Sequence, residues 1–447
     1  MSVEEIRVEG FIGDDDDEIT GEAMSGLREK RHEKIEKKNQ SSITRFLGKG
    51  KKVHNVGIMK RYYGELLVWA LQRYLEKEQW QVEKTLGYHE REPIFLDIHT
   101  DCTTIENLMV DGQLFLSRGE ERLIATIDTA MPFRKLILVE GLARHENQTN
   151  AFIEGVLELA KEQNFYRGKN IEFTSRIRFL DVQEKTWESV ILDASIKEEI
   201  KANTLGFLRQ SEKWKRLGIP LKRGILLSGE PGTGKTIICK SLMTESDSIT
   251  CISTSGYDLA EDEYITQLYE MAQDLSPCIV FIEDIDLIAQ NRMEFGFMRG
   301  PALLSLLAVM DGVEEQREIV TVATTNCLEL LDKAISERPS RFDRVIKLTR
   351  PRLEHRHELV KNICRTIPLR ETVQNYIAGK TEDFSPAQIQ EIIFSLVIQH
   401  PDEEAEIDVT HDEIDRLISR ISGKSRQSMG FKMNGNGNHS GHDLVSG

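Results

Sequence analysis

The sequence predicts an α/β protein whose central parallel sheet is followed by a helical domain and preceded by a smaller α+β domain. Three observations favour this class. An apolar run at 224–228 leads into a glycine-rich segment, and two more apolar runs, at 278–282 and 319–323, end in polar residues. Beyond residue 351 only helical patterns follow. Short apolar runs that alternate with helices are typical of buried parallel strands.

The glycine-rich segment reads Gly-Glu-Pro-Gly-Thr-Gly-Lys-Thr and has the composition of a phosphate-binding loop. Glycines let backbone N–H groups turn toward phosphate oxygens, the lysine supplies a cation, and the threonine offers a hydroxyl to Mg²⁺. A glycine-rich turn can also arise by chance, but the strand before it and the helix after it favour a phosphate site. The candidate nucleotide-binding residues are Gly229, Glu230, Pro231, Gly232, Thr233, Gly234, Lys235, Thr236 and Ile237.

The second apolar run ends in Glu283 and Asp284. Acids at the carboxyl end of a parallel strand lie where open α/β sheets bind ligands. We expect this pair to hold the water shell of Mg²⁺ and to polarise an attacking water, with Thr236 and Glu283 as the metal-binding residues. Taken alone, the pair could instead be a solvated strand end, which is the less favoured interpretation.

The third apolar run ends in Asn326, whose side chain could orient the water or the γ-phosphate. Taken alone, an asparagine after a strand is more often a turn residue. The fourth element is the segment Arg341-Phe-Asp-Arg344. By itself such a segment is more often a surface salt-bridge site, so its interpretation depends on the three elements before it.

From Trp187 to about Gly423 the chain resembles an AAA ATPase of the extended AAA+ superfamily. Besides the phosphate loop, the resemblance rests on Phe281–Asp286, Met310-Asp-Gly-Val-Glu314, Ala323–Asn326, Arg341–Arg344 and Asp383-Phe-Ser-Pro-Ala-Gln388. It implies a P-loop AAA+ core with a C-terminal helical lid. It also implies ATP and Mg²⁺ as cofactors and a homo-oligomeric ring, by default a hexamer, with a heptamer left open.

The resemblance also implies roles for single residues. Lys235 and Thr236 bind phosphate and magnesium, Asn326 is the sensor, and Arg341 and Arg344 are arginine fingers that reach a neighbouring subunit's nucleotide. A guanidinium suits this role because it is always charged and can hold phosphate oxygens with two bonds. Hydrolysis would then depend on assembly of the ring.

One departure from the family pattern concerns the acids. Most members carry Asp-Glu at this strand end, whereas this chain has Glu283-Asp284. The presumed base, Asp284, is therefore one methylene shorter, which could slow hydrolysis unless the backbone shifts. The same order is similar to that of the mitochondrial Bcs-type translocase and related prokaryotic AAA ATPases, so we expect activity to be retained.

Aromatic residues in two loops are candidates for contact with a substrate in the central pore of the ring. Tyr257 is the best of them, with Tyr264 second, and Phe295 and Phe297 lie in a later loop. The usual aromatic-apolar-glycine order is missing. Tyr257 could instead pack at a helix start, and the two phenylalanines between subunits.

Composition limits the possible functions. The formal net charge of −16 disfavours nucleic-acid binding, which relies on lysine and arginine. The six cysteines have no CxxC spacing, which favours a reducing, cytoplasmic setting. No run resembles a signal peptide or approaches the ~20 residues of a membrane span. The His-Glu-x-x-His zinc motif is also missing, so we expect no zinc protease site.

The domain organisation follows from these patterns. We expect a disordered charged tail over 1–54, an α+β domain over 55–185, the ATPase core over 186–350, the helical lid over 351–423 and a disordered Gly/Asn/Ser tail over 424–447. Within the α+β domain we expect an amphipathic helix over 55–82, strands at 94–98, 113–116, 123–127, 135–139 and 171–180, and a helix over 151–163. In the lid, helices are expected near 353–366, 370–379, 386–399 and 411–422.

The function predicted from these elements is that of a chaperone-like ring ATPase that remodels, unfolds or translocates proteins. The N-terminal α+β domain would recruit the substrate or an adaptor. The missing pore pattern and the reversed acids leave open an ATP-dependent assembly switch or scaffold with slow hydrolysis. A DNA-associated ATPase is a third reading, which the acidic composition disfavours.

Overall fold

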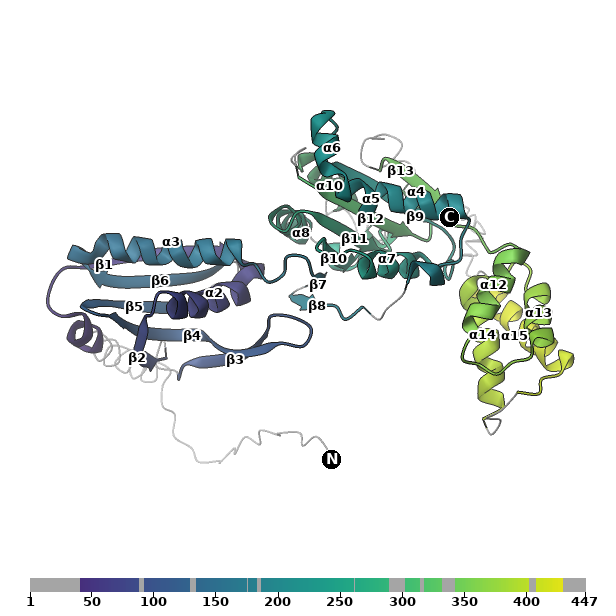
Figure 1. Cartoon of the computed structure of the whole chain (residues 1–447), viewed down its shortest axis with the longest axis horizontal. Helices are drawn as coiled ribbons and strands as arrows, with labels where there is room; N and C mark the ends of the chain where they lie inside the picture. The colour runs from purple at the N-terminus through teal and green to yellow at the C-terminus, as the bar shows by residue number, and fades with distance from the viewer. Residues whose placement is uncertain are drawn as a thin grey trace, which may run out of the picture. The chain divides into compact units, whose positions relative to one another are not determined.

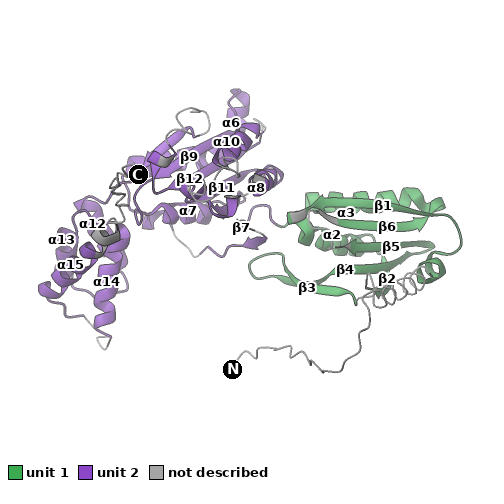
Figure 2. Ribbon diagram, turned by 180° about the vertical axis from the view of Figure 1, so that it is seen from behind, with its two compact units in different colours: residues 1–165 green, residues 166–447 purple. Residues whose placement is uncertain are grey.

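The computed structural model describes residues 41–87, 92–128, 134–174, 176–182, 186–260, 262–288, 302–313, 317–331, 342–401 and 407–428. The chain divides into two compact units, Met1–Phe165 and Tyr166–Gly447, which Figure 2 colours green and purple. Each unit has its own buried apolar core. The predicted α/β class with a parallel sheet is confirmed.

Unit 1 is built on a six-stranded sheet whose pairs are all antiparallel (Figure 1). The strand order is β1-β6-β5-β4-β2, and β3 also pairs with β4. The strands are β1 Lys52–Lys60, β2 Gln81–Leu86, β3 Ile94–His99, β4 Ile105–Arg118, β5 Glu121–Asp128 and β6 Arg134–Leu142.

Helices cover both faces of this sheet. The helix α3 (Glu146–Glu162), preceded by η2 (Ala143–His145), packs beside α2 (Gly64–Lys77). A Cβ at Gly141 would lie 2.8 Å from Thr149 of α3, so the small residue allows this close packing. On the opposite face, Ile43 and Leu47 of the helical residues 41–47 pack against Phe115 and Ile124. The expectation of a disordered tail over 1–54 is therefore wrong for its last part.

The helix expected over 55–82 is wrong in its first part and at its end. Residues 52–60 form strand β1, a short 3-10 turn η1 (Arg61–Tyr63) follows, and α2 ends at Lys77. In β1 the small Gly57 lies against Ile137 of β6 and Ile153 of α3. Pairing with β6, which only the folded chain provides, therefore outweighed the local helical pattern.

Unit 2 contains a seven-stranded sheet with the order β13-β9-β12-β11-β10-β7-β8. All pairs are parallel except that between β7 and β8. The strands are β7 Asn170–Phe173, β8 Ile177–Phe179, β9 Lys222–Ser228, β10 Thr250–Ser255, β11 Cys278–Glu283, β12 Ile319–Thr325 and β13 Arg344–Lys347. The central strands are almost entirely buried, as expected for a sheet covered on both faces.

Two layers of helices cover this sheet (Figure 1). One face packs on a core that α4, α5 and α7 share with the strands. On the other face, Tyr269 of α8 shares a hydrogen bond of 2.9 Å with Thr321 of β12. The elements are η3 Trp187–Ser189, α4 Ala194–Asn203, α5 Leu205–Arg209, α6 Ser211–Arg216, α7 Lys235–Thr244, η4 Asp258–Ala260, α8 Asp262–Asp274, α10 Ala302–Gly312 and η5 Leu328–Leu330.

The strand expected over 171–180 in the N-terminal domain has a different place in the structure. It is a hairpin, β7 and β8, and it extends the sheet of unit 2. Ile252 of β10 lies opposite Ile171, so the apolar side chains of the hairpin continue the core of the ATPase sheet. The compact units accordingly divide between Phe165 and Tyr166.

The helical part of unit 2 follows β13 and has its own apolar core. Its helices are α12 Leu353–Ile363, α13 Glu371–Lys380, α14 Pro386–Gln399 and α15 His411–Ser428. Ser385 begins α14 with a capping box: its hydroxyl accepts from the Gln388 backbone N–H, and the Gln388 side chain accepts in return. These helices match the four expected from the sequence.

All six cysteines lie in the described ranges and carry thiols rather than disulfides. Burial raises the pKa of Cys251 to about 12 and that of Cys364 to about 11. Both thiols therefore stay protonated at neutral pH and act as small apolar residues. Among the described residues, no helix combines the length and the apolar character that crossing a membrane requires.

Candidate active site

The glycine-rich loop connects β9 to α7, which begins at Lys235. Gly232 and Gly234 have φ angles of 81° and 101°, a left-handed region that glycine adopts readily. These two glycines let the chain turn back so that α7 starts directly beneath the loop. The first amides of a helix lack intrahelical partners and carry the positive end of its dipole, so this arrangement suits an anion.

Lys235 is buried inside the loop. Its Nζ donates to the carbonyl oxygens of Gly229 at 2.6 Å and of Glu230 at 3.1 Å. Burial lowers the pKa of Lys235, while Asp284 and Asp286 act in the opposite direction. The amine is thus held at the place where a phosphate would meet the loop.

Two oxygen ligands for a metal ion meet beside this loop. The hydroxyl of Thr236 donates to Oε2 of Glu283, at the end of β11, over 3.1 Å. Hard oxygen donors of this kind fit Mg²⁺, which takes one or two protein ligands and completes its shell with water and phosphate oxygens. In the described part of the chain, His, Cys, Asp and Glu form no group of three or more that could hold a metal ion by themselves.

Asp284 and Asn326 form the second polar pair at this edge of the sheet. The Asn326 side-chain amide donates to Oδ1 of Asp284 over 2.8 Å. Asp284 has a φ of 50°, and its backbone N–H donates to the Thr324 hydroxyl at 3.0 Å. The chain thus turns sharply after Glu283, and this turn aims the two consecutive acids at different partners.

Asp286 is a third acid of this region, to which the sequence analysis gave no role. It is buried, and its Oδ1 accepts from the Thr325 hydroxyl at 2.9 Å and from the Asn326 backbone N–H at 3.2 Å. It therefore fixes the end of β12 and, with it, the position of Asn326. In the sequence, an acid three residues after Glu283 in an otherwise apolar stretch could have indicated this role.

Replacing Asp286 with alanine is expected to lower the free energy of unfolding by about 1–3 kcal/mol, because the buried Thr325 hydroxyl and the partly buried Asn326 N–H lose their acceptor. Turnover should fall as well, since Asn326 loses its anchor. Chemical denaturation followed by circular dichroism measures the stability effect. The control is Asp258→Ala, which removes an acid bonded to the partly buried Ser255 at 2.6 Å. Equal stability of the two variants would contradict the anchoring role of Asp286.

A small cavity of about 40 Å³ lies between the loop, the segment Ser189–Leu192 and the lid. Apolar side chains line most of it, among them Ile237, Ile238, Pro351 and Leu359. A larger cavity, of about 620 Å³, borders Thr236 and Glu283. The lining of the first suits the flat face of a base, although its volume is too small for one unless it widens, and the second adjoins the metal-binding end of the site.

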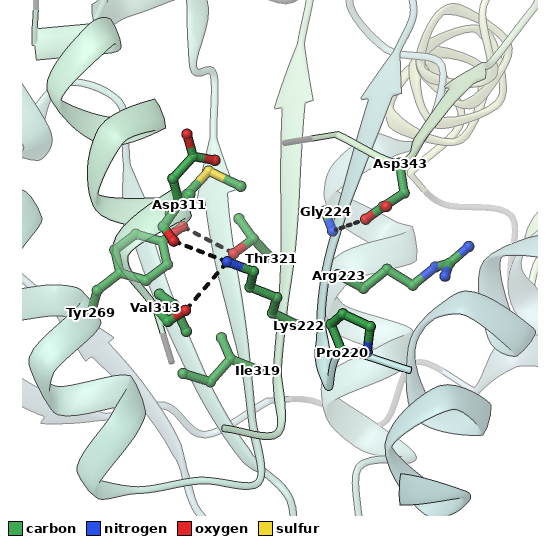
Figure 3. Close-up of a pocket in the computed structure, with 11 residues that line it drawn as sticks. Pro220, Lys222, Arg223, Gly224, Tyr269, Asp311, Val313, Ile319, Thr321 and Asp343 are labelled. Carbon is green, nitrogen blue, oxygen red and sulfur yellow. Dashed lines mark hydrogen bonds between the residues drawn. The ribbon is translucent and has the colours of Figure 1, made fainter. Parts of the chain in front are cut away.

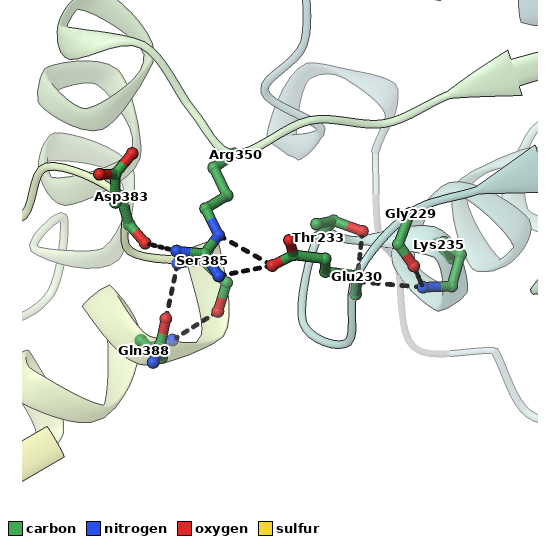
Figure 4. Close-up of polar contacts among 8 residues, drawn as sticks. All are labelled: Gly229, Glu230, Thr233, Lys235, Arg350, Asp383, Ser385 and Gln388. Carbon is green, nitrogen blue, oxygen red and sulfur yellow. Dashed lines mark hydrogen bonds and ion pairs between the residues drawn. The ribbon is translucent and has the colours of Figure 1, made fainter. Parts of the chain in front are cut away.

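The lid contacts the phosphate loop directly (Figure 4). The backbone N–H of Ala387, in the first turn of α14, donates to the carbonyl of Gly232 over 3.3 Å. Arg350, just before α12, forms an ion pair with Glu230 of the loop at 2.5 Å. Neither this contact nor the pairing of Glu230 was predicted from the sequence.

Arg344 lies at the start of the edge strand β13, level with the middle of β9 and not with the phosphate loop that follows β9. It pairs with Ile225 of β9, about 13 Å along the strand from Gly229 at ~3.3 Å per residue. Its side chain is 56% exposed, and its Nε lies 3.8 Å from Glu199. Arg341 lies outside the described residues.

Asp343 fixes the start of this segment, because its Oδ2 accepts from the Gly224 backbone N–H at 2.8 Å (Figure 3). Beside it is a cavity of about 230 Å³ that Lys222, Tyr269 and Asp311 also line. The Lys222 amine donates to the carbonyl of Asp311 at 2.9 Å. The bond between Asp343 and Gly224 thus ties the arginine segment to the strand that carries the phosphate loop.

The predicted pore residues differ in their surroundings. Tyr257 lies just before η4, but its side chain is 73% exposed, so it does not pack against this helix start. The preceding Gly256 donates its N–H to the Glu283 carbonyl at 2.7 Å, which joins this loop to the acid turn. Tyr264 instead contacts Phe173 edge to face. Phe295 and Phe297 lie outside the described residues.

Comparison with known proteins adds independent findings. Residues 225–350 match the family model "ATPase family associated with various cellular activities (AAA)". The proteasome-activating nucleotidase of Methanopyrus kandleri is 33% identical over 343 residues, which cover 73% of this chain and 74% of that protein.

Two bacterial relatives match over a shorter span. The ATP-dependent zinc metalloprotease FtsH 2 of Sphaerobacter thermophilus is 31% identical over 55% of this chain and 39% of its own length. The corresponding protein of Acidobacterium capsulatum is 34% identical over 49% of this chain and 36% of its own length. The chain therefore spans well under half the length of these two metalloproteases.

Proposed function

Because the chain belongs to the AAA family of ATPases, we propose that it binds ATP together with Mg²⁺ and hydrolyses it to ADP and phosphate. The observation that carries the proposal is the meeting of two polar pairs beside the buried Lys235. These pairs are Thr236 with Glu283 and Asn326 with Asp284. Together they supply a phosphate cation, a metal-binding pair and an oriented base, the parts that phosphoryl transfer to water requires.

Each residue then has a defined task. Lys235 and the first amides of α7 hold the β- and γ-phosphate oxygens. Bound at Thr236 and Glu283, Mg²⁺ would neutralise charge that develops on the phosphates. Asp284, oriented by the Asn326 amide, accepts a proton from water while the water oxygen bonds to the γ-phosphorus and the bond to the bridging oxygen breaks.

We assign Arg341 and Arg344 to the active site of a neighbouring subunit. Arg344 is exposed and lies about 13 Å from the phosphate loop along β9, which supports a role outside its own site. The active unit would then be a homo-oligomeric ring, a hexamer by default, with a heptamer as the alternative. Each site would be complete only when two subunits meet.

We further propose that the ring acts on proteins. One of its relatives is an ATP-dependent metalloprotease, and another is a nucleotidase that activates the proteasome. The exposed Tyr257 would grip the substrate, and its neighbour Gly256 bonds to Glu283 and would transmit the nucleotide state to it. Unit 1 would recruit the substrate or an adaptor, and the six thiols favour a reducing, cytoplasmic setting.

The test is ATP turnover per subunit over a wide range of protein concentrations. A cooperative rise with concentration is expected, because each site waits for a neighbour's arginines. Arg344→Ala should abolish this rise but leave ATP binding intact. Flat, negligible turnover in the presence of tight ATP binding would contradict the motor and indicate an assembly switch. No ATP binding at all would refute the proposal itself.

A further inference from the structure

Arg350 connects two segments that are far apart in the sequence (Figure 4). It lies between β13 and α12, where the chain passes from the sheet into the lid. Its Nε and Nη2 donate to Oε2 of Glu230 at 2.9 and 2.5 Å. Its Nη1 donates to the backbone carbonyl of Asp383. One guanidinium therefore joins the phosphate loop to the turn that precedes α14.

The lid side of this contact is rigidly built. Asp383 has a φ of 60°, which turns its carbonyl toward Arg350, and Ser385 then caps α14. The start of α14 rests on the loop so closely that a Cβ at Gly232 would lie 2.9 Å from the Ser385 hydroxyl and 3.0 Å from Ala387. The lid thus sits on the loop that would surround the phosphates.

The contact also leaves little room for a nucleotide. The cavity between Val190, Ile237 and Leu359 measures about 40 Å³. Such a volume holds only a few water molecules and is too narrow for a purine base. A base that enters between the loop and the lid would therefore push the lid away from the core. Any group that holds the lid on the loop then opposes this movement.

We propose that Arg350 is a positioning residue that latches the lid on the phosphate loop when no nucleotide is bound, and that nucleotide entry breaks its pair with Glu230. This inference rests on the proposed nucleotide-binding function. The phosphates of a nucleotide repel the Glu230 carboxylate and attract the guanidinium, which binds phosphate oxygens as well as carboxylates. The nucleotide therefore competes with Glu230 for Arg350.

The pair of Arg350 with Glu230 is expected to oppose lid opening only moderately. The Arg350 side chain is 31% exposed and that of Glu230 is 60% exposed, so solvent screens their attraction. Two hydrogen bonds to one carboxylate oxygen and a third to the Asp383 carbonyl make this contact stronger than an ordinary surface ion pair. Loss of the latch should make lid opening about three to ten times more frequent, which reaches above the roughly fivefold upper value of ordinary exposed pairs.

The first test is amide hydrogen exchange in the nucleotide-free full chain, read on peptides that cover residues 383–389. Arg350→Gln and Glu230→Gln should each raise the exchange rate about three- to tenfold, and the double variant no further, because both remove one pair. In the charge-swapped variant Glu230→Arg/Arg350→Glu, the exchange rate of these peptides should return toward the wild-type rate. Lys215→Gln is the matched control: this lysine is 36% exposed and binds Glu212 and Glu318 in unit 2, each at 2.8 Å.

Unchanged exchange in the single variants, or additive effects in the double variant, would overturn the latch. The second test is the rate at which a fluorescent ADP binds to the nucleotide-free protein. The double variant Glu230→Gln/Arg350→Gln keeps the summed charge of the pair, so faster binding would reflect loss of the latch and not altered charge. Binding as slow as in wild type would overturn the gating role. If wild type bound no ADP, the proposed function would fail, and the exchange data would still decide whether the latch exists.

Discussion

Asp284→Asn is expected to bind ATP as the wild-type protein does and to turn it over at least about a hundredfold more slowly. An amide cannot accept the proton of the attacking water, but it keeps the size of the aspartate. The hydrogen bond with Asn326 can persist through the amide oxygen, so the turn after Glu283 should stay in place. Steady-state turnover and equilibrium ATP binding, measured on the same preparation, separate the two effects.

The control for this variant is Glu318→Gln. Glu318 lies just before β12, at the opposite end of the strand, and binds Lys215 there. Loss of the Glu318 carboxylate should change ATP turnover little. Comparable turnover of Asp284→Asn and wild type would rule out Asp284 as the base. Glu283, the acid bonded to Thr236, would then be the next candidate, and Glu283→Gln would test it.

Lys235→Ala is expected to abolish measurable turnover and to weaken ATP binding at least about tenfold. The variant loses the cation aimed at the phosphates, and one such group contributes about a hundredfold to the rate of comparable reactions. Equilibrium binding of a fluorescent ATP analogue and a phosphate-release assay measure the two losses. The matched control, Lys213→Ala, removes an exposed lysine of α6 that lies over Trp214.

The loss in Lys235→Ala should not come from unfolding. Burial lowers the pKa of Lys235 below its ordinary value of 10.5, so the charged form opposes folding at neutral pH. Removal of the amine is therefore expected to leave the thermal unfolding temperature of the nucleotide-free protein similar or higher. A variant that unfolds earlier than wild type would contradict this account of the lysine.

Much of unit 2 could be predicted because its signals are local. Each strand of the core is a short apolar run, and the polar residues at its carboxyl end follow at once in the sequence. The topology of a parallel sheet brings these ends to one edge. The pairs of Thr236 with Glu283 and of Asp284 with Asn326 join residues that the sequence had already singled out.

The features that escaped prediction depend on distant partners. Glu230 and Arg350 are 120 residues apart, and nothing in the sequence spacing identifies them as an ion pair. Asp286 gains its importance from Thr325 and Asn326, which only the pairing of β11 with β12 brings near. Strand β1 likewise needs β6, about eighty residues further along the chain. The roles of Arg341 and Arg344 and the similarity to the Glu-Asp subgroup stay predictions.

The β7–β8 hairpin has a practical consequence for work on isolated fragments. A fragment that begins at residue 186, where the sequence suggested the domain start, would lack this hairpin and leave β10 with an open edge. An uncovered, apolar edge strand is a template for pairing between molecules and hence for aggregation. A fragment that begins at Tyr166 keeps β7 on β10 and ends the sheet with the three-residue β8. It should therefore stay monodisperse where the shorter fragment precipitates.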